Sequence, residues 1–166
     1  MPATLGDRMM RKFLIAAAAM AGLLGAGAAS AQDIDADPNY GELTLSAGFT
    51  PDPALVSLLA GGSIDAADKS TGCTGFISDA PDMRLFWDGS GKGAPNLKIS
   101  ALSNADATLV VNGPDGRWYC DDDSGEDSNP LVELTPRAGR YEIWVGTYAE
   151  GETKRAVLSI SEVSSF

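Results

Sequence analysis

The sequence predicts an all-β fold, an antiparallel jelly-roll-like β-sandwich, and three observations support that prediction. Short apolar segments alternate with clusters of Gly, Pro, Asp and Asn throughout the chain after residue 41. Several of these segments alternate apolar and polar residues with a period of two, which is typical of strands with one buried and one solvated face. No stretch after residue 41 sustains helical periodicity over ten residues.

Residues 1–31 have the three parts of a secretory signal peptide. Arg11 and Lys12 form a basic region, an apolar run rich in Ala, Leu and Gly follows, and Ala29-Ser30-Ala31 supplies the small residues of a cleavage site. A membrane anchor is the alternative, but the run is short and lacks a positive flank on its far side. We expect cleavage after residue 31, and therefore a periplasmic or extracellular protein with no membrane span after cleavage.

After cleavage, 135 residues remain, which is enough chain for one hydrophobic core. Residues 32–41 are acidic and turn-like, so we expect a flexible leader there and a single domain over residues 42–166. The expected strands are 42–47, 54–60, 73–78, 82–87, 96–102, 107–112, 117–120, 131–134, 140–147 and 154–161.

The strand at 140–147 shows the alternation most regularly. Tyr141, Ile143 and Val145 are expected on one face, and Glu142, Trp144 and Gly146 on the other. If the sheet has one buried and one solvated face, the first set belongs to the core. The sequence Asn-Gly-Pro-Asp-Gly at 112–116 predicts a tight hairpin turn between two strands.

The protein is strongly acidic. The whole chain has 23 acidic and 12 basic residues, and removal of residues 1–31 leaves 22 and 9, a net charge of −13. A surface of this charge repels nucleic acid and anionic lipid, and it favours divalent cations or basic partners. Solubility of an exported protein is the simpler explanation for most of these carboxylates.

The chain contains no histidine. This absence excludes Ser-His-Asp and Cys-His catalytic arrangements, the usual general base near neutral pH, and every zinc site that uses histidine. Ser57, Ser63 and Ser70 lie near Lys69 in the sequence, so composition leaves a Ser-Lys dyad open. Nothing in the sequence places that lysine in a dry site, and we expect no enzymatic activity.

Cys73 and Cys120 are the two cysteines of the chain. An even number of cysteines in an exported protein predicts one disulfide. The bridge would close a loop of about 47 residues and contribute about 4 kcal/mol of stability in the chain-entropy model. Two free thiols or a metal pair are the alternatives, and no histidine or third cysteine is present to complete a metal site.

Segment 120–130 contains the candidate metal ligands. Five acidic residues fall within seven positions, where a cation has to neutralise their repulsion or water has to screen it. Carboxylates on a glycine-containing loop suit Ca²⁺, which accepts irregular coordination, although the spacing does not fit an EF-hand. We predict a calcium site formed by Asp121, Asp122, Asp123 and Asp127, with a solvated loop as the alternative.

Aromatic residues near this loop predict a ligand surface. Trp118 lies on the strand before Cys120, and Trp144 and Tyr148 lie along 140–148. If Trp118 and Trp144 are on neighbouring strands, they would form a platform for a sugar or a peptide. The alternative is that these side chains belong to the core or cover the disulfide.

Three segments resemble the bacterial pre-peptidase C-terminal (PPC) domain. They are residues 106–116, with an aspartate before an apolar strand and a glycine turn, the acidic run 120–123, and the Gly-x-Tyr strand at 139–146. The resemblance covers about residues 97–161. It implies a jelly-roll-like sandwich of a family that accompanies secreted proteases, with some relatives binding calcium and matrix polymers such as collagen. It also implies cation ligands at 121–123 and a structural role for Asp106.

These features favour a free-standing exported binding or accessory module that calcium would stabilise if the acidic loop binds it. Its ligand would be a protein or a polysaccharide that the sequence does not identify, and its oligomeric state stays open. A structural or self-associating component of the envelope or matrix is the alternative hypothesis. A secreted hydrolase is disfavoured because the chain has no histidine.

Overall fold

The computed structural model describes residues 34–91 and 96–166. The expected signal peptide, residues 1–31, lies outside the described residues, as do Gln32 and Asp33. Within the described ranges, no helix is long and apolar enough to span a membrane. Their regular structure consists of strands and two short 3-10 helices, η1 (Ala66–Asp68) and η2 (Glu126–Ser128).

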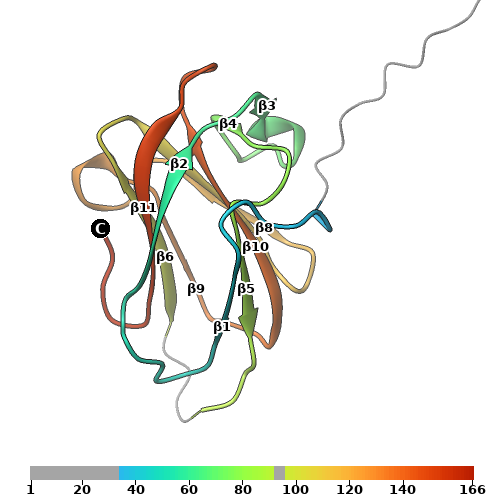
Figure 1. Cartoon of the computed structure of the whole chain (residues 1–166), viewed down its shortest axis with the longest axis vertical. Helices are drawn as coiled ribbons and strands as arrows, with labels where there is room; N and C mark the ends of the chain where they lie inside the picture. The colour runs from blue at the N-terminus through green and yellow to red at the C-terminus, as the bar shows by residue number, and fades with distance from the viewer. Residues whose placement is uncertain (1–33, 92–95) are drawn as a thin grey trace, which may run out of the picture.

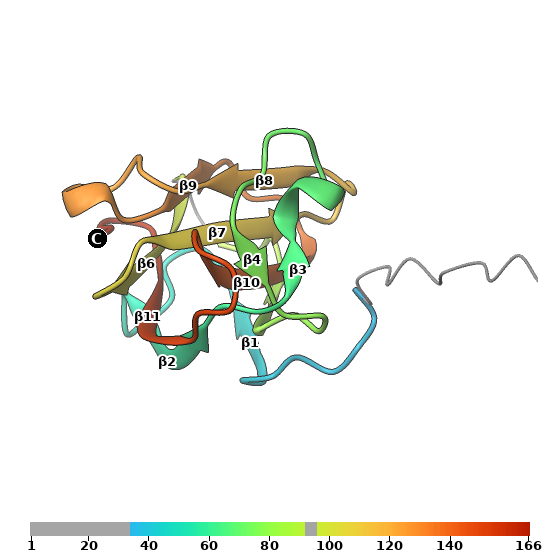
Figure 2. The same cartoon turned by 90° about the horizontal axis from the view of Figure 1, so that it is seen from above.

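Two sheets stack on each other, as Figure 1 and Figure 2 show from two directions. Sheet A contains β1 (Glu42–Leu45), β3 (Ile64–Asp65), β4 (Phe76–Ile77), β5 (Met83–Trp87), β7 (Ala107–Asn112), β8 (Trp118–Asp121) and β10 (Gly139–Thr147). Sheet B contains β2 (Ala54–Ala60), β6 (Leu97–Ser103), β9 (Leu131–Leu134) and β11 (Lys154–Ser161).

Strand β10 is the centre of sheet A. One edge of β10 pairs with β5 and, further along, with β4, whereas the other edge pairs with β7, which in turn pairs with β8. Sheet B has the order β2-β11-β6-β9. These pairs are antiparallel, and β1 adds to β5 in parallel. The predicted antiparallel jelly-roll-like sandwich is confirmed, with one parallel pair at an edge of sheet A.

Period-two alternation places the inner faces of both sheets in one shared core. In β10, the side chains of Tyr141, Ile143 and Val145 point into this core and are buried. Residues Leu158 and Ile160 of β11 face them from sheet B. A fully buried Leu, Ile or Val side chain contributes about 1.5–3 kcal/mol, so this alternation is the main sequence feature that determines the fold.

The outer face of sheet A is covered, which differs from the solvated face expected for Glu142, Trp144 and Gly146. Residues 62–78, which we call the cover segment, fold over this face and carry β3, η1 and β4. Together with sheet A they form a second small core that includes Trp144 and Val110. Strand alternation predicts which face a side chain takes, but not whether another segment covers that face.

The packing of the cover segment explains the glycine at position 146. A Cβ atom there would lie 2.4 Å from Thr108 Oγ1 and 2.7 Å from the carbonyl oxygen of Phe76. Both distances are far below van der Waals contact. Only glycine therefore allows β4 to approach β10 this closely.

Residues 34–41 are hydrogen-bonded to the rest of the domain, and the flexible leader expected over residues 32–41 stays a prediction. The Arg84 side chain donates hydrogen bonds to the carbonyl oxygens of Ile34 (3.3 Å) and Ala36 (2.9 Å). The backbone N–H of Tyr40 donates to the carbonyl oxygen of Asp82 at 2.8 Å. The buried arginine needs these acceptors, and the acidic composition of the segment gave no sign of them.

The outer face of sheet B is covered at one end only. Residues 162–166 fold back over it, with the N–H of Phe166 donating to Ser100 Oγ at 3.1 Å, and Ser100 and Ser159 are buried beneath them. The rest of this face stays open. Leu55, Leu59 and Leu102 are 56%, 49% and 43% exposed there.

Candidate functional site

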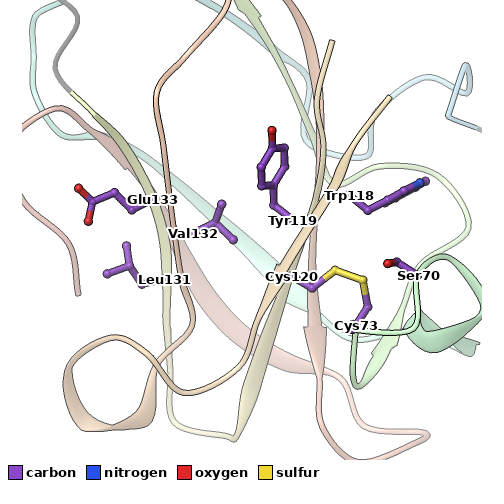
Figure 3. A pocket seen from close by; sticks show the side chains of 9 residues that line it. Ser70, Cys73, Trp118, Tyr119, Cys120, Leu131, Val132 and Glu133 are labelled. Atoms are coloured by element: carbon purple, nitrogen blue, oxygen red, sulfur yellow. A yellow bond between two sulfur atoms is a disulfide. The ribbon is translucent and has the colours of Figure 1, made fainter. Parts of the chain in front are cut away.

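A groove of about 410 Å³ lies between β8, an edge strand of sheet A, and β9, an edge strand of sheet B. Figure 3 shows Trp118, Ser70 and the two cysteines on one side of this groove and Leu131, Val132 and Glu133 on the other. We call it the β8–β9 groove. Its lining residues are Ser70, Gly72, Cys73, Trp118, Tyr119, Cys120, Leu131, Val132 and Glu133.

Strand β8 reaches the groove through the hairpin turn that the sequence predicted at 112–116. The N–H of Gly113 donates to the carbonyl oxygen of Arg117 at 2.8 Å, and the register continues this pairing along β7 and β8. Bonded pairs recur every second residue in an antiparallel ladder. The backbone N–H and C=O groups of Trp118 and Cys120 therefore point away from β7, towards an edge that no other described strand occupies.

The same argument applies to β9. The N–H of Ala101 donates to the carbonyl oxygen of Pro130 at 3.2 Å, which sets the parity of the β6–β9 ladder. The backbone groups of Leu131 and Glu133 therefore point away from β6. The N–H of Leu131 donates to Asp121 Oδ2 at 2.8 Å, which confirms that this edge of β9 faces β8. Two open strand edges thus meet across the groove.

The disulfide predicted between Cys73 and Cys120 is present, with a Cα–Cα distance of 5.1 Å. It joins the cover segment to β8 and forms part of the groove wall. A covalent brace at this position fixes the edge strand relative to the segment that lies over it.

The predicted aromatic platform is corrected by the structure. Trp144 is 0% exposed, and its ring lies beneath Trp118 with centroids 5.6 Å apart. The prediction that Trp144 belongs to an exposed ligand surface is therefore wrong, and the alternative of core packing holds. Trp118 is half-buried and lines the groove. Tyr148 is 54% exposed but is not a lining residue, so it does not join Trp118 in one site.

The loop that connects β8 to β9, residues 122–130, follows directly on the two strands of the groove, but none of its residues lines the groove. Asp121 organises this loop, because its carboxylate accepts hydrogen bonds from the N–H of Ser124 (2.9 Å), the hydroxyl of Ser124 (2.6 Å) and the N–H of Leu131. Asp122 accepts a hydrogen bond from the hydroxyl of Thr74 at 3.3 Å. Asp123 and Asp127 are exposed.

No group of three or more His, Cys, Asp or Glu side chains in residues 34–91 and 96–166 is arranged so that it could hold a metal ion. Partial desolvation raises the pKa of Asp106, and the negative charges of Asp123 and Asp122 raise it further. These carboxylates from two segments therefore repel one another. The calcium site predicted at Asp121, Asp122, Asp123 and Asp127 stays a prediction.

Sequence reasoning missed the groove itself. Glu133 is assigned by the sequence only to a strand, because the meeting of two edges from different sheets leaves no local pattern. Ser70, which was considered for a Ser-Lys dyad, lines the groove, whereas Ser57 lies on β2 in the other groove described below. The structure therefore does not gather these serines into one site.

A second groove, of about 640 Å³, lies on the open part of the outer face of sheet B. Its walls include Leu59, Leu102 and Val157, with Arg155 and Tyr40 at its margin. The Tyr40 hydroxyl accepts a hydrogen bond from the N–H of Leu59 at 2.9 Å, so it occupies part of the free edge of β2.

Comparison with known proteins finds similarity at the level of solved structures. The pre-peptidase C-terminal domain of a collagenase from Bacillus anthracis has a TM-score of 0.42 and 14% identity, and the match covers 76% of this chain and all of that one (100%). The chain is similar to a PPC domain. That agrees with the resemblance inferred from its sequence segments.

A second similar structure is PliG of Aeromonas hydrophila, a periplasmic inhibitor of g-type lysozyme. Its TM-score is 0.39 at 17% identity, and the match covers 76% of this chain and 98% of that one. No family model matches the sequence, and no curated protein matches it. At these identities the PPC-like similarity concerns the fold, so the function has to follow from this chain's own residues.

Proposed function

We propose that this chain is an exported, non-catalytic binding module that holds a protein partner in the β8–β9 groove. One observation carries the proposal: two open strand edges converge on a groove that has an aromatic wall, a disulfide brace and one charged lining residue, Glu133. Binding sites often combine an apolar wall with a few oriented polar groups, and here the backbone of both edges supplies those polar groups.

Export is supported by two independent features. Residues 1–31 have the composition of a signal peptide, and the Cys73–Cys120 disulfide is the kind of bond that persists in oxidising compartments. We therefore assign the protein to the periplasm or the exterior of the cell.

The chemistry of the groove supports binding rather than catalysis. Its ionisable side chains are Tyr119 and Glu133, and the chain has no histidine to act as a base near neutral pH. Glu133 already accepts a hydrogen bond from the Asn96 side chain at 2.9 Å. A carboxylate held in this way suits positioning of a cation more than proton transfer.

Photo-crosslinking of the exported protein tests the proposal. Benzoylphenylalanine replaces Tyr119 in the groove or, as a matched control, the exposed Tyr148 outside it, and envelope and culture fractions are irradiated. We expect a protein adduct from position 119 that is absent from position 148 and weakens with added salt. Equal adducts from both positions, or none from position 119, would refute binding in the groove.

Self-association is the second candidate function, and the second groove favours it. Leu55, Leu59 and Leu102 form an exposed apolar patch on sheet B, and patches of this kind mark interaction surfaces. The net charge of the exported chain, −13, opposes contact between copies unless salt screens it. Sedimentation from low to high salt, with Leu59→Ser and Leu102→Ser as variants, should show salt-promoted dimers that both variants abolish.

We also propose that Ca²⁺ stabilises the acidic loop at residues 121–127. The support is the mutual repulsion of five acidic residues within these seven positions, together with the preference of Ca²⁺ for carboxylate oxygens. Bound Ca²⁺ would stabilise the folded protein by relieving this repulsion as it draws the carboxylates together.

A further inference from the structure

We infer that the partner enters the β8–β9 groove as an extended, basic segment that pairs with the open edge of β9 and becomes a fifth strand of sheet B. This inference rests on the proposed binding function and specifies its mode and the chemistry of the partner. Addition of a strand to an open sheet edge is a recurring mode of peptide recognition, in which backbone hydrogen bonds supply affinity and side-chain pockets supply specificity.

The hydrogen-bonding pattern of the β6–β9 ladder defines which backbone groups of β9 are available. The N–H and C=O groups of Leu131 and Glu133 point away from β6, as the Ala101–Pro130 hydrogen bond requires. The N–H of Leu131 already donates to Asp121. The N–H of Glu133 and the carbonyl oxygens of Leu131 and Glu133 are left to bind a new strand.

The opposite wall of the groove suits the side chains of such a segment. Trp118 and Tyr119 are both half-buried there, with the ring of Trp118 supported from below by Trp144. The disulfide holds this wall in place. Aromatic rings fixed in this way offer contact area at a low entropic cost, and they would cover one face of the added strand.

The charge distribution specifies a basic occupant. No lysine or arginine lines the groove, and Glu133 is its charged lining residue. The loop that connects β8 to β9 carries further carboxylates, including the exposed Asp123 and Asp127. A second copy of this acidic chain would be repelled from this position, whereas a segment with Lys or Arg side chains would be attracted.

The opposite edge of sheet B, formed by β2, is less available. The free edge of β2 is partly occupied, because the N–H of Leu59 donates to the Tyr40 hydroxyl. This hydrogen bond also shows that the backbone N–H and C=O groups of the odd-numbered residues of β2, including Ser57, point away from β11. Ser57 is therefore an outward-facing edge position that corresponds to Glu133 on the other side of sheet B, which provides a matched control.

The test uses the disulfide-bonded mature chain, residues 32–166, and a displayed library of random twelve-residue peptides as the probe. We expect the enriched peptides to combine Lys or Arg with β-branched residues, and we expect benzoylphenylalanine at position 119 to capture them. Enrichment of acidic or glycine-rich peptides, or of none, would overturn strand addition by a basic segment.

The decisive measurement is backbone methylation of an enriched peptide, because it needs no change in the protein. N-methylation at alternate residues removes the N–H groups of one edge of a strand. We expect the peptide methylated on the edge that faces β9 to bind at least tenfold more weakly. The peptide methylated at the other set of alternate residues should bind within twofold of the unmethylated peptide. Equal tolerance of both sets of methylation would show that the groove binds without strand pairing, although the binding function itself would stand.

A proline at the open edge tests the same pairing from the protein side. Glu133→Pro removes an outward N–H and leaves the ladder to β6 intact, so we expect at least a tenfold loss of peptide affinity. Ser57→Pro makes the matching change on β2 and should leave affinity unchanged, and Glu133→Gln separates the loss of charge from the loss of the N–H. Thermal melts confirm folding, and unchanged affinity in folded Glu133→Pro would refute pairing with β9.

Discussion

Asp82 is buried beside β10, where its carboxylate joins three segments of the chain. It accepts hydrogen bonds from the N–H of Val145 (2.8 Å), the side-chain amide of Asn39 (3.2 Å) and the hydroxyl of Ser78 (3.4 Å). Burial raises the pKa of Asp82 from 3.8 to about 6, although these hydrogen bonds act to lower it. The protonated form is therefore favoured in the folded protein relative to the unfolded chain.

This pKa predicts a pH dependence of stability with a defined sign. Because the folded pKa lies above the unfolded one, the contribution of Asp82 is fully present below about pH 4 and is lost as pH rises through about 6. Acidification from pH 7 to pH 4 should add about 2 kcal/mol from this group, because the side chain in the unfolded chain is still about half ionised at pH 4. Urea unfolding of the native protein and of Asp82→Asn, measured at both pH values, should show this difference between them.

Asp79→Asn is the control for that measurement, because Asp79 is an exposed carboxyl in the same turn. It should keep the pH dependence of the native protein. A native protein and Asp82→Asn that lose stability in parallel over this range would contradict the assignment of the pH dependence to Asp82.

Arg84 and Glu142 form a buried ion pair on the outer face of sheet A. Arg84 Nε lies 2.6 Å from Glu142 Oε1, and Arg140 Nε lies 3.0 Å from the same oxygen. Hydrogen bonding to Glu142 raises the pKa of Arg84, and burial raises the pKa of Glu142 despite the two arginines. Removal of one member of such a pair leaves a buried charge without compensation.

We expect Glu142→Gln to lower the free energy of unfolding by about 3 kcal/mol. The half-exposed Glu42, which also pairs with Arg84 at 3.0 Å, is the control, and Glu42→Gln should cost less than about 1 kcal/mol. Equal losses in the two variants, measured by urea unfolding at pH 7, would show that burial of the pair is not what matters.

Among the elements, the cover segment depends most on a covalent bond. It has few residues in regular structure, with β3 and β4 being two residues long each. Its links to sheet A are the short pairing of β4 with β10, the disulfide, the packing around Trp144 and the Thr74–Asp122 hydrogen bond. The segment is therefore expected to detach more easily than the strands of either sheet.

Replacement of both cysteines by serine should lower the free energy of unfolding by about 4 kcal/mol, because the bridge closes a 47-residue loop. It should also expose Trp144 to solvent. A red shift in tryptophan emission and new proteolytic cleavage within 62–78 would report the detachment. Cleavage in sheet B at the same protease dose would instead indicate that the whole sandwich had loosened.

The elements also show how far a local pattern predicts structure. Segments 54–60, 107–112, 131–134 and 154–161 were predicted with the bounds that β2, β7, β9 and β11 have. Each is a short segment rich in apolar residues and set off by turn or loop residues, so the local sequence is enough to predict it. The expected strand at 73–78 shrinks to β4, because Cys73 is tied to Cys120 and Gly75 adopts a positive φ of 85°.

The candidate site was less predictable than the strands, for a reason that belongs to the whole molecule. The disulfide and the half-buried Trp118 could be found from residue type and position. The meeting of β8 with β9 depends on how two sheets stack, and no local spacing encodes that. Trp144 was misplaced because a segment about 70 residues earlier covers its face.

At the scale of the whole molecule, charge is the dominant feature. Residues 32–166 carry a net charge of −13, so the folded state is destabilised by self-repulsion. Salt should therefore stabilise it in proportion to screening. A stabilisation that is specific to Ca²⁺ therefore has to exceed the stabilisation that ionic strength alone provides.

A thermal melt distinguishes the two effects. If Ca²⁺ binds the acidic loop, millimolar Ca²⁺ should raise Tm above the value in Mg²⁺ at equal ionic strength, and the increase should grow with the logarithm of its concentration. Asp122→Asn and Asp123→Asn should each remove this excess. Identical curves in Ca²⁺ and Mg²⁺, or an excess that survives both substitutions, would refute the loop assignment.

Residues 162–166 lie over sheet B close to the loop that connects β8 to β9. A Cβ atom added at Gly125 would be 2.6 Å from the carbonyl oxygen of Phe166. An affinity handle or fluorescent protein fused behind Phe166 would therefore sit beside the carboxylates of this loop and mask their charge. Binding assays that measure the effect of this charge should use the chain with no fusion behind Phe166.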